Sequence, residues 1–201
     1  MLNSSEDSYM APTDEELMLK VKDDGDGRAF ELLVQRHRKP ILNFVYRFLC
    51  DQEVAEDVSQ EVFLRLWASA GTYLPIARFT TFLYTIARNL CLNALAKSRN
   101  APSMQSLDET DTEIDRQMQG KTADPSGSPE REVIGKETER MIMEATGKLS
   151  PEHRLVFILT EYHGLSYQEV AAIVQCPMGT VASRKNAAVR QLRSRLASLR
   201  E

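Results

Sequence analysis

The sequence predicts an all-α protein of two small helical domains joined by a flexible acidic linker. Apolar residues recur at helical spacing over about 13–99 and again over about 130–200, without the alternation typical of strands. Residues 100–130 are instead rich in proline, glycine, serine and acidic side chains. Such a segment buries too little apolar surface to offset the entropy lost when its backbone is ordered. A chain of 201 residues has room for two domains of this kind.

Four helices are expected in the first domain. They cover about 13–23, 28–50, 51–69 and 79–99. Thr13 and Glu16 form a Thr-x-x-Glu capping box at the start of the first helix, and Asp51 is placed to cap the third. Pro40 falls inside the second helix, where proline either kinks a helix or splits it in two.

The second domain ends in two short helices joined by a turn that contains glycine. We expect the helices at about 166–174 and 180–200, with the turn at 175–179. Ser166 and Glu169 form a second capping box, and Thr180 is the expected N-cap of the last helix. Ser150 before Pro151 marks another helix start upstream. This is the layout of a helix-turn-helix, whose second helix enters the major groove of DNA.

The last helix has the two faces that a DNA-reading helix needs. Val181, Ala188 and Leu192 share an apolar arc. The opposite side carries short, polar or basic side chains, namely Ala182, Ser183, Asn186, Arg190 and Arg193. Asparagine reads adenine, and arginine reads guanine or binds phosphate. A basic amphipathic helix by itself is commonly only the outer helix of a small domain, but the capping signals and the turn favour DNA binding.

A compact polar face is expected on the third helix. Asp57, Gln60 and Glu61 fall at i, i+3 and i+4, with Leu64 at i+7. Such a patch suits docking against a basic helical partner, through charge pairs around a small apolar contact. Periodicity alone favours the simpler interpretation, which is a solvated helix face.

Long segments of both domains resemble one known family. Residues 55–67 (AEDVSQEVFLRLW) and 77–90 (ARFTTFLYTIARNL) resemble region two of the extracytoplasmic-function sigma factors of bacteria. Residues 165–171 (LSYQEVA) and 177–181 (PMGTV) resemble region four of the same family. The motifs occur in the family's order. The resemblance implies a leader at 1–12, region two at 13–99, a linker at 100–130 and region four at 131–201.

The resemblance also implies a role for each candidate surface. The face of Asp57, Gln60, Glu61 and Leu64 would bind the clamp helices of the largest RNA polymerase subunit. The loop before the fourth helix, with that helix, would bind the melted −10 promoter element through Tyr73, Arg78, Phe79, Arg88, Asn89 and Lys97. Tyr73 would form a wall of the pocket for a flipped-out base. The last helix would bind the −35 duplex through Thr180, Ser183, Arg184, Asn186, Arg190 and Arg193.

Two positions of the last helix depart from the family pattern. Lys185 stands where relatives usually have an aliphatic residue, and Ala187 where they usually have arginine. Lys185 projects toward the apolar side, so its ammonium group would have to extend outward past apolar neighbours. The departure counts against the usual readout of bases in the −35 element. Contact between Arg184 and a phosphate is still expected.

These features imply a bacterial sigma factor that brings core RNA polymerase to promoters. The implied partners are the polymerase, at its clamp helices and flap, promoter DNA, and an anti-sigma factor that wraps both domains. Two other functions remain open. A free-standing helix-turn-helix regulator with a helical sensing or dimerisation domain would bind duplex DNA tightly without polymerase. A helical interaction protein would bind polymerase but not promoters.

The distribution of charge is consistent with binding to nucleic acid, although the whole chain carries a net charge of −4. Residues 31–100 and 151–201 each carry +3, whereas 1–30 and 101–130 each carry −5. The basic segments are the expected DNA-binding ones. The resemblance implies that the acidic linker would thread the basic channel of the polymerase by mimicking nucleic acid.

Other classes of function lack support in the sequence. Cys50, Cys91 and Cys176 are too widely spaced for a disulfide framework or a metal knuckle. His37, His153 and His163 lack metal-ligand spacing, and surface or capping roles are expected for them. We find no catalytic constellation, cofactor motif, signal peptide or membrane-spanning segment, so a cytoplasmic protein that is not an enzyme is expected.

Overall fold

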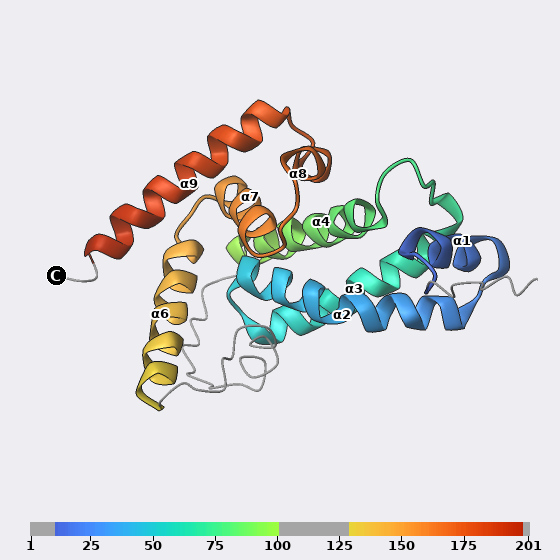
Figure 1. Ribbon diagram of the computed structural model, residues 1–201, viewed down its shortest axis with the longest axis horizontal. Coiled ribbons are helices and arrows are strands. Elements are labelled where there is room, and N and C mark those ends of the chain that lie inside the picture. Colours follow the sequence, from blue (N-terminus) through green and yellow to red (C-terminus); the bar gives the residue numbers. More distant parts are fainter. Residues whose placement is uncertain (1–10, 101–128, 199–201) are drawn as a thin grey trace, which may run out of the picture.

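The computed structural model describes residues 11–100 and 129–198, and every regular element in these two ranges is helical (Figure 1). The first range holds α1 (Asp14–Asp24), α2 (Gly27–Leu49), α3 (Gln52–Ala68), the 3-10 turn η1 (Ala70–Thr72) and α4 (Phe79–Asn100). The second holds α6 (Pro129–Gly147), α7 (Pro151–Glu161), α8 (Tyr167–Val174) and α9 (Met178–Ser198). The all-α prediction is confirmed. The expected leader and linker fall almost wholly outside the described residues.

Side-chain caps start the helices where the sequence indicates. Thr13 Oγ1 accepts a hydrogen bond from the Glu16 amide at 3.2 Å, and Glu16 accepts in return from the Thr13 amide at 2.9 Å. Ser166 and Glu169 form the same reciprocal pair at the start of α8. Asp51 accepts from the Val54 amide and so caps α3. These three predicted caps are confirmed, because each depends only on residues within one helical turn.

The structure decides two points about the helix bounds. Pro40 is expected either to kink or to split the second helix, and it does not split it, because α2 continues through it from Gly27 to Leu49. The last helix begins at Met178, so the prediction of Thr180 as its N-cap is wrong. The carbonyl of Pro177 accepts hydrogen bonds from the amides of Thr180 and Val181 at 2.8 and 3.2 Å, which places Thr180 inside the first turn.

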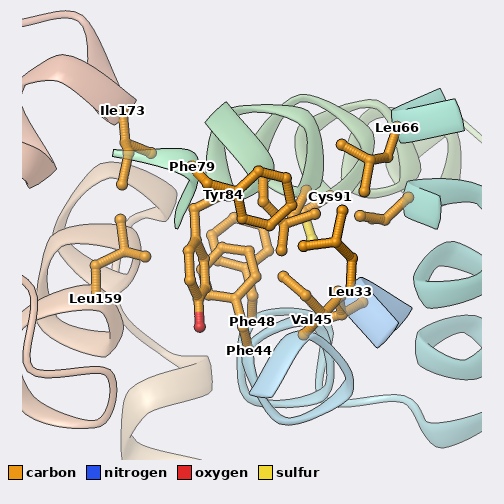
Figure 2. Packing of buried hydrophobic residues seen from close by; sticks show 14 of the residues in the cluster. Leu33, Phe44, Val45, Phe48, Leu66, Phe79, Tyr84, Cys91, Leu159 and Ile173 are labelled. Carbon is orange, nitrogen blue, oxygen red and sulfur yellow. The ribbon is translucent and has the colours of Figure 1, made fainter. Parts of the chain in front are cut away.

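The two expected domains pack against each other around a continuous apolar core. In Figure 2, Leu159 of α7 and Ile173 of α8 point toward Phe44 of α2 and Tyr84 of α4. A second, smaller cluster joins α6 to α9 through Ala145, Leu149, Ala188 and Leu192. The helix-turn-helix thus rests on the first domain, with α9 at the opposite end of the molecule from α1 (Figure 1).

A buried guanidinium joins the two domains. Arg154 on α7 donates to the carbonyl oxygen of Phe48, near the C-terminus of α2, at 2.6 Å. It also donates to the carbonyls of Gly147 and Leu149, between α6 and α7. The last carbonyls of a helix lack partners inside the helix, and a cation is favourable near them. Arg154 therefore satisfies carbonyl groups of both domains at one point.

Further polar contacts surround the apolar interface. The Tyr84 hydroxyl lies 2.8 Å from His163 Nδ1, and Arg78 forms an ion pair with Glu169 at 3.3 Å. On the other side, Arg47 pairs with Glu139, and its guanidinium lies 3.9 Å from the ring centroid of Tyr162. Residues from both domains are therefore paired across the interface.

Candidate nucleic-acid and polymerase interfaces

The acidic face predicted on the third helix forms one outward surface of α3. Asp57, Gln60 and Leu64 are exposed, and Leu64 keeps 65% of its surface accessible. Glu61 is partly exposed and accepts from Arg65 at 2.6 Å. The opposite side of α3 is fully buried through Ala55, Val62 and Leu66. Burial of that side fixes the rotation of the helix, so the four predicted side chains share one accessible face.

Trp67 extends this face and was not singled out from the sequence as a site residue. It is 44% exposed, and its ring packs edge-on against Phe30 of α2 with the centroids 4.9 Å apart. It follows Leu64 by three residues, so the spacing of Asp57, Gln60 and Leu64 already pointed to it. A large exposed aromatic beside acidic groups is a common anchor of protein interfaces.

The loop between η1 and α4 presents five exposed residues, Leu74–Arg78, between two buried aromatics. Tyr73 is only 1% exposed and packs on Phe82 at a centroid distance of 5.3 Å. Phe79 is fully buried. As they lie here, neither ring offers a face to a base, contrary to the expectation for Tyr73 as a pocket wall. Packing of large aromatic rings against each other favours their burial.

The apolar surface of the loop comes from residues that the sequence analysis did not select. Leu74 is 60% exposed and Ile76 86% exposed. A signal was present in the sequence, since both flank Pro75 in a segment where the helical pattern is interrupted. Apolar side chains on such a loop can wedge against unstacked bases.

The basic residues predicted for −10 binding lie along α4 and at its start. Arg78 is exposed, while Asn89 and Lys97 lie further along the helix and are also exposed. Arg88 is partly buried and donates to Asn89 Oδ1 at 3.3 Å. From Arg78 to Lys97 the helix rises roughly 28 Å at 1.5 Å per residue. The structure thus distributes these groups along the helix, with Arg88 and Lys97 on opposite sides of it, rather than in a closed pocket.

The predicted reading face of α9 is accessible. Ser183, Asn186, Arg190 and Arg193 are exposed, whereas Thr180 and Arg184 are partly buried. Val181 and Ala188 are fully buried on the other side, and Leu192 nearly so. The second helix of the helix-turn-helix therefore presents its polar residues outward, as a groove-reading helix requires.

Lys185 has an acidic partner instead of an apolar environment. Its ammonium group lies 2.6 Å from Glu161 on α7 and 5.4 Å from the ring centroid of Tyr167 on α8. The hydrogen bond that Lys185 donates to Glu161 raises the pKa of Lys185 above its ordinary value. Lys185 thus links three helices of the second domain, which gives its departure from the family pattern a structural role.

His163 lies inside the domain interface, so the surface or capping role expected for it is wrong. Its ring packs near Phe44 and Tyr84, with centroid distances of 5.8 and 5.1 Å. Burial, and then the charge of Arg47, lower the pKa of His163 to about 4. The ring is consequently neutral at pH 7.

The described residues contain no cluster of three or more His, Cys, Asp or Glu side chains that could hold a metal ion. The three cysteines are free, and burial raises the pKa of Cys50 and Cys91. Within residues 11–100 and 129–198, no helix has the length and apolar character needed to cross a membrane.

Comparison with known proteins gives consistent matches. Models of Sigma-70 region 2 and Sigma-70 region 4 match residues 33–101 and 139–192. The RNA polymerase sigma-H factor of Pseudomonas aeruginosa is 35% identical over 85% of this chain and 87% of its own. The ECF RNA polymerase sigma-E factor of Haemophilus influenzae is 33% identical over 86% and 89%. The sigma factor RpoE of Bartonella quintana, solved with the anti-sigma factor NepR, has a TM-score of 0.65 at 21% identity, over 85% of this chain and 98% of that one.

Proposed function

This chain belongs to the extracytoplasmic-function sigma factors. We propose which of its surfaces bind the polymerase, the −10 element and the −35 element. As a sigma factor it directs core RNA polymerase to promoters and initiates transcription. Residues 13–99 form the part that binds polymerase and the melted −10 element. Residues 131–201 form the part that binds the −35 duplex, and the acidic residues 100–130 connect the two.

The polymerase-binding surface is the outer face of α3. Asp57, Gln60 and Glu61 meet basic residues of the clamp helices, while Leu64 and Trp67 supply the apolar centre of the contact. The accessible face beside a fully buried one supports this assignment, because Asp57, Gln60, Glu61 and Leu64 lie outside the core. A second contact with the polymerase flap is assigned to region four.

The melted −10 strand contacts the loop before α4 and the basic and polar residues along that helix. Arg78, Arg88, Asn89 and Lys97 bind phosphates or base edges, and the exposed loop Leu74–Arg78 contacts unstacked bases. Tyr73 and Phe79 support the loop from below. The observation that carries this assignment is the loop itself, which exposes two large apolar side chains next to basic groups.

The −35 duplex meets α9. Ser183 and Asn186 face the base edges, Arg184, Arg190 and Arg193 bind phosphates or guanine, and Thr180 lies at the helix start. The helix-turn-helix layout and the burial of the opposite side support this role.

The packed arrangement has to open before the promoter surfaces are free. Arg78, which is assigned to −10 DNA, is paired here with Glu169 of the helix-turn-helix. A partner that holds the domains together would therefore keep the factor inactive. The Bartonella quintana relative was solved with an anti-sigma factor, and we extend that kind of partner to this chain. Cytoplasmic location and the lack of catalysis of its own complete the proposal.

Run-off transcription with purified core polymerase tests the proposal. The full chain is expected to give a promoter-specific transcript. The double variant Asp57→Ala with Glu61→Ala should lose polymerase binding, while its thermal unfolding stays within a few degrees of the parent, because both side chains lie outside the core. Glu144→Ala is the control, since Glu144 is also an exposed acid but lies on α6, away from α3.

Two outcomes would contradict the proposal. Tight, specific duplex binding without polymerase and without a transcript would instead indicate a free-standing regulator. Unfolding of the double variant would mean that the α3 face is structural.

A further inference from the structure

Helix α1 holds both ends of the exposed loop Leu74–Arg78. At one end, Lys22 Nζ donates to the carbonyl of Tyr73 at 2.8 Å. At the other end, the Phe79 amide donates to Glu15 Oε1 at 2.7 Å. The matched region-2 segment begins at residue 33, so α1 lies outside it. Two side chains of one helix thus bind the two backbone groups that flank the loop.

The start of α4 needs an acceptor that the local sequence does not supply. The first amides of a helix have no partner within the helix, and a side-chain oxygen of the preceding residue usually accepts from them. That residue is Arg78, whose side chain has donors but no acceptor. Glu15 fills this position from a helix 64 residues away, and its negative charge is favourable at a helix N-terminus.

Helix α1 fixes the spacing between the Glu15 and Lys22 contacts. Glu15 and Lys22 are separated by seven residues, which is about two turns and roughly 10 Å along the helix. Met18 lies on the same face between them and is fully buried. Helix α1 is itself anchored, because Asp14 pairs with Arg36 and His37 of α2, each at 2.7 Å. The distance between the loop ends is therefore set by α1.

We propose that Glu15 and Lys22 are positioning residues for promoter melting, which fix the loop Leu74–Arg78 in the shape that reads the −10 element. A loop of five residues whose ends are free samples many conformations. All but the bound conformation are lost on binding, which costs conformational entropy. With both ends held, Leu74 and Ile76 are already displayed toward the nucleic acid, so less ordering is needed when a base unstacks. The inference rests on the proposed role of this loop in −10 recognition.

Reconstituted holoenzyme tests the inference with matched substitutions. Glu15→Met and Lys22→Met keep the length of each side chain but remove the acceptor or the donor. Each is expected to slow promoter opening about tenfold, measured with a fluorescent base in the −10 element, which corresponds to about 1.4 kcal/mol. Each should also weaken discrimination against a mutated −10 base. Polymerase affinity and −35 duplex binding should stay unchanged. Glu15→Gln, which retains an acceptor oxygen, should recover most of the opening rate.

Two control substitutions lie on the same helix. Glu16→Gln removes the neighbouring carboxylate yet keeps the capping box, which accepts glutamine as well as glutamate. Lys20→Met removes an exposed lysine of α1. Both should open promoters at the parent rate. If the controls slow promoter opening as much as Glu15→Met does, the change in the charge of α1 is the cause, and the inference is wrong.

Hydrogen exchange of the full chain separates this inference from the proposed function. Exchange at the Phe79 amide should accelerate about tenfold in Glu15→Met, since its acceptor is lost. Unchanged exchange there would overturn the positioning role. The function of the loop is tested by Ile76→Ala, which leaves the Phe79 amide protected but should alter −10 discrimination. An Ile76→Ala variant with parent discrimination would overturn the role of the loop while the exchange result still stood.

Discussion

Arg154 shows how one side chain can join two domains. It is buried, and its guanidinium donates to carbonyls at the end of α2 and between α6 and α7. Each hydrogen bond to a charged group contributes about 1.5–3 kcal/mol to the free energy of unfolding. A buried carbonyl that loses its donor has no water to replace it, which adds to the loss of stability.

Arg154→Met should therefore lower the free energy of unfolding by about 3 kcal/mol, because methionine fills the space of the side-chain stem but donates nothing. Denaturant titration measures the change. Arg190→Met, on the exposed face of α9, is the control and should change stability by less than about 0.5 kcal/mol. Equal losses for the two variants would contradict the role assigned to Arg154.

The partly buried His163 makes stability depend on pH. Its pKa is about 4 in the folded protein, below the value of about 6.5 for a solvated histidine. Between these values the unfolded chain binds the extra proton, so stability falls as the pH drops through this window. The pKa of the Glu152 and Glu169 carboxyls is lowered from 4.5. Their contribution to the free energy of unfolding is therefore lost only as the pH falls below that value.

From pH 7 to pH 5 the unfolding free energy should decrease by about 2 kcal/mol on account of His163. Urea titrations at several pH values measure it. His163→Asn, which lacks a titrating ring, should show a correspondingly flatter profile over this range. A parent and variant with parallel profiles would show that His163 is not the group responsible.

At the scale of the elements, two glycines of the second domain have different backbone conformations. Gly164 joins α7 to α8 with φ 62°, in the left-handed region, whereas Gly179 lies in the first turn of α9. A Cβ atom added at either position meets nothing within 4 Å. The two sites therefore differ only in backbone conformation.

Gly164→Ala should destabilise the protein by about 1–2 kcal/mol, because an L-residue is strained in the left-handed region. Gly179→Ala should stabilise it by up to about 1 kcal/mol, since alanine loses less entropy in a helix. Thermal unfolding should shift by a few degrees in opposite directions. Shifts of the same sign would contradict the assignment of backbone strain.

At the scale of the whole molecule, the two domains share an apolar cluster that includes Phe44 and Tyr84 on one side and Leu159 and Ile173 on the other (Figure 2). Domains with a common core are expected to unfold together rather than in succession. Trp67 is the single tryptophan of the chain and lies on α3, so its fluorescence reports on the first domain.

Ile173→Ala, a substitution in the helix-turn-helix, should lower stability by about 2–5 kcal/mol by leaving a cavity. The Trp67 fluorescence transition should move by the same amount as the far-UV circular dichroism transition. A Trp67 transition that stays at the parent midpoint would mean that the first domain unfolds independently.

The sequence by itself determined the helices, three of their N-caps and the outward faces of α3 and α9. These features depend on residues within one or two turns, whose spacing and hydrogen-bonding groups are visible in the chain. The tertiary structure alone decided that Tyr73 and Phe79 turn inward, that His163 lies in an interface, and that Glu15 accepts a hydrogen bond from the Phe79 amide. Those outcomes join groups far apart in the chain, 64 residues for Glu15 with Phe79 and 106 for Arg154 with Phe48. Local periodicity contains no record of such pairs, because they arise only when whole helices pack together.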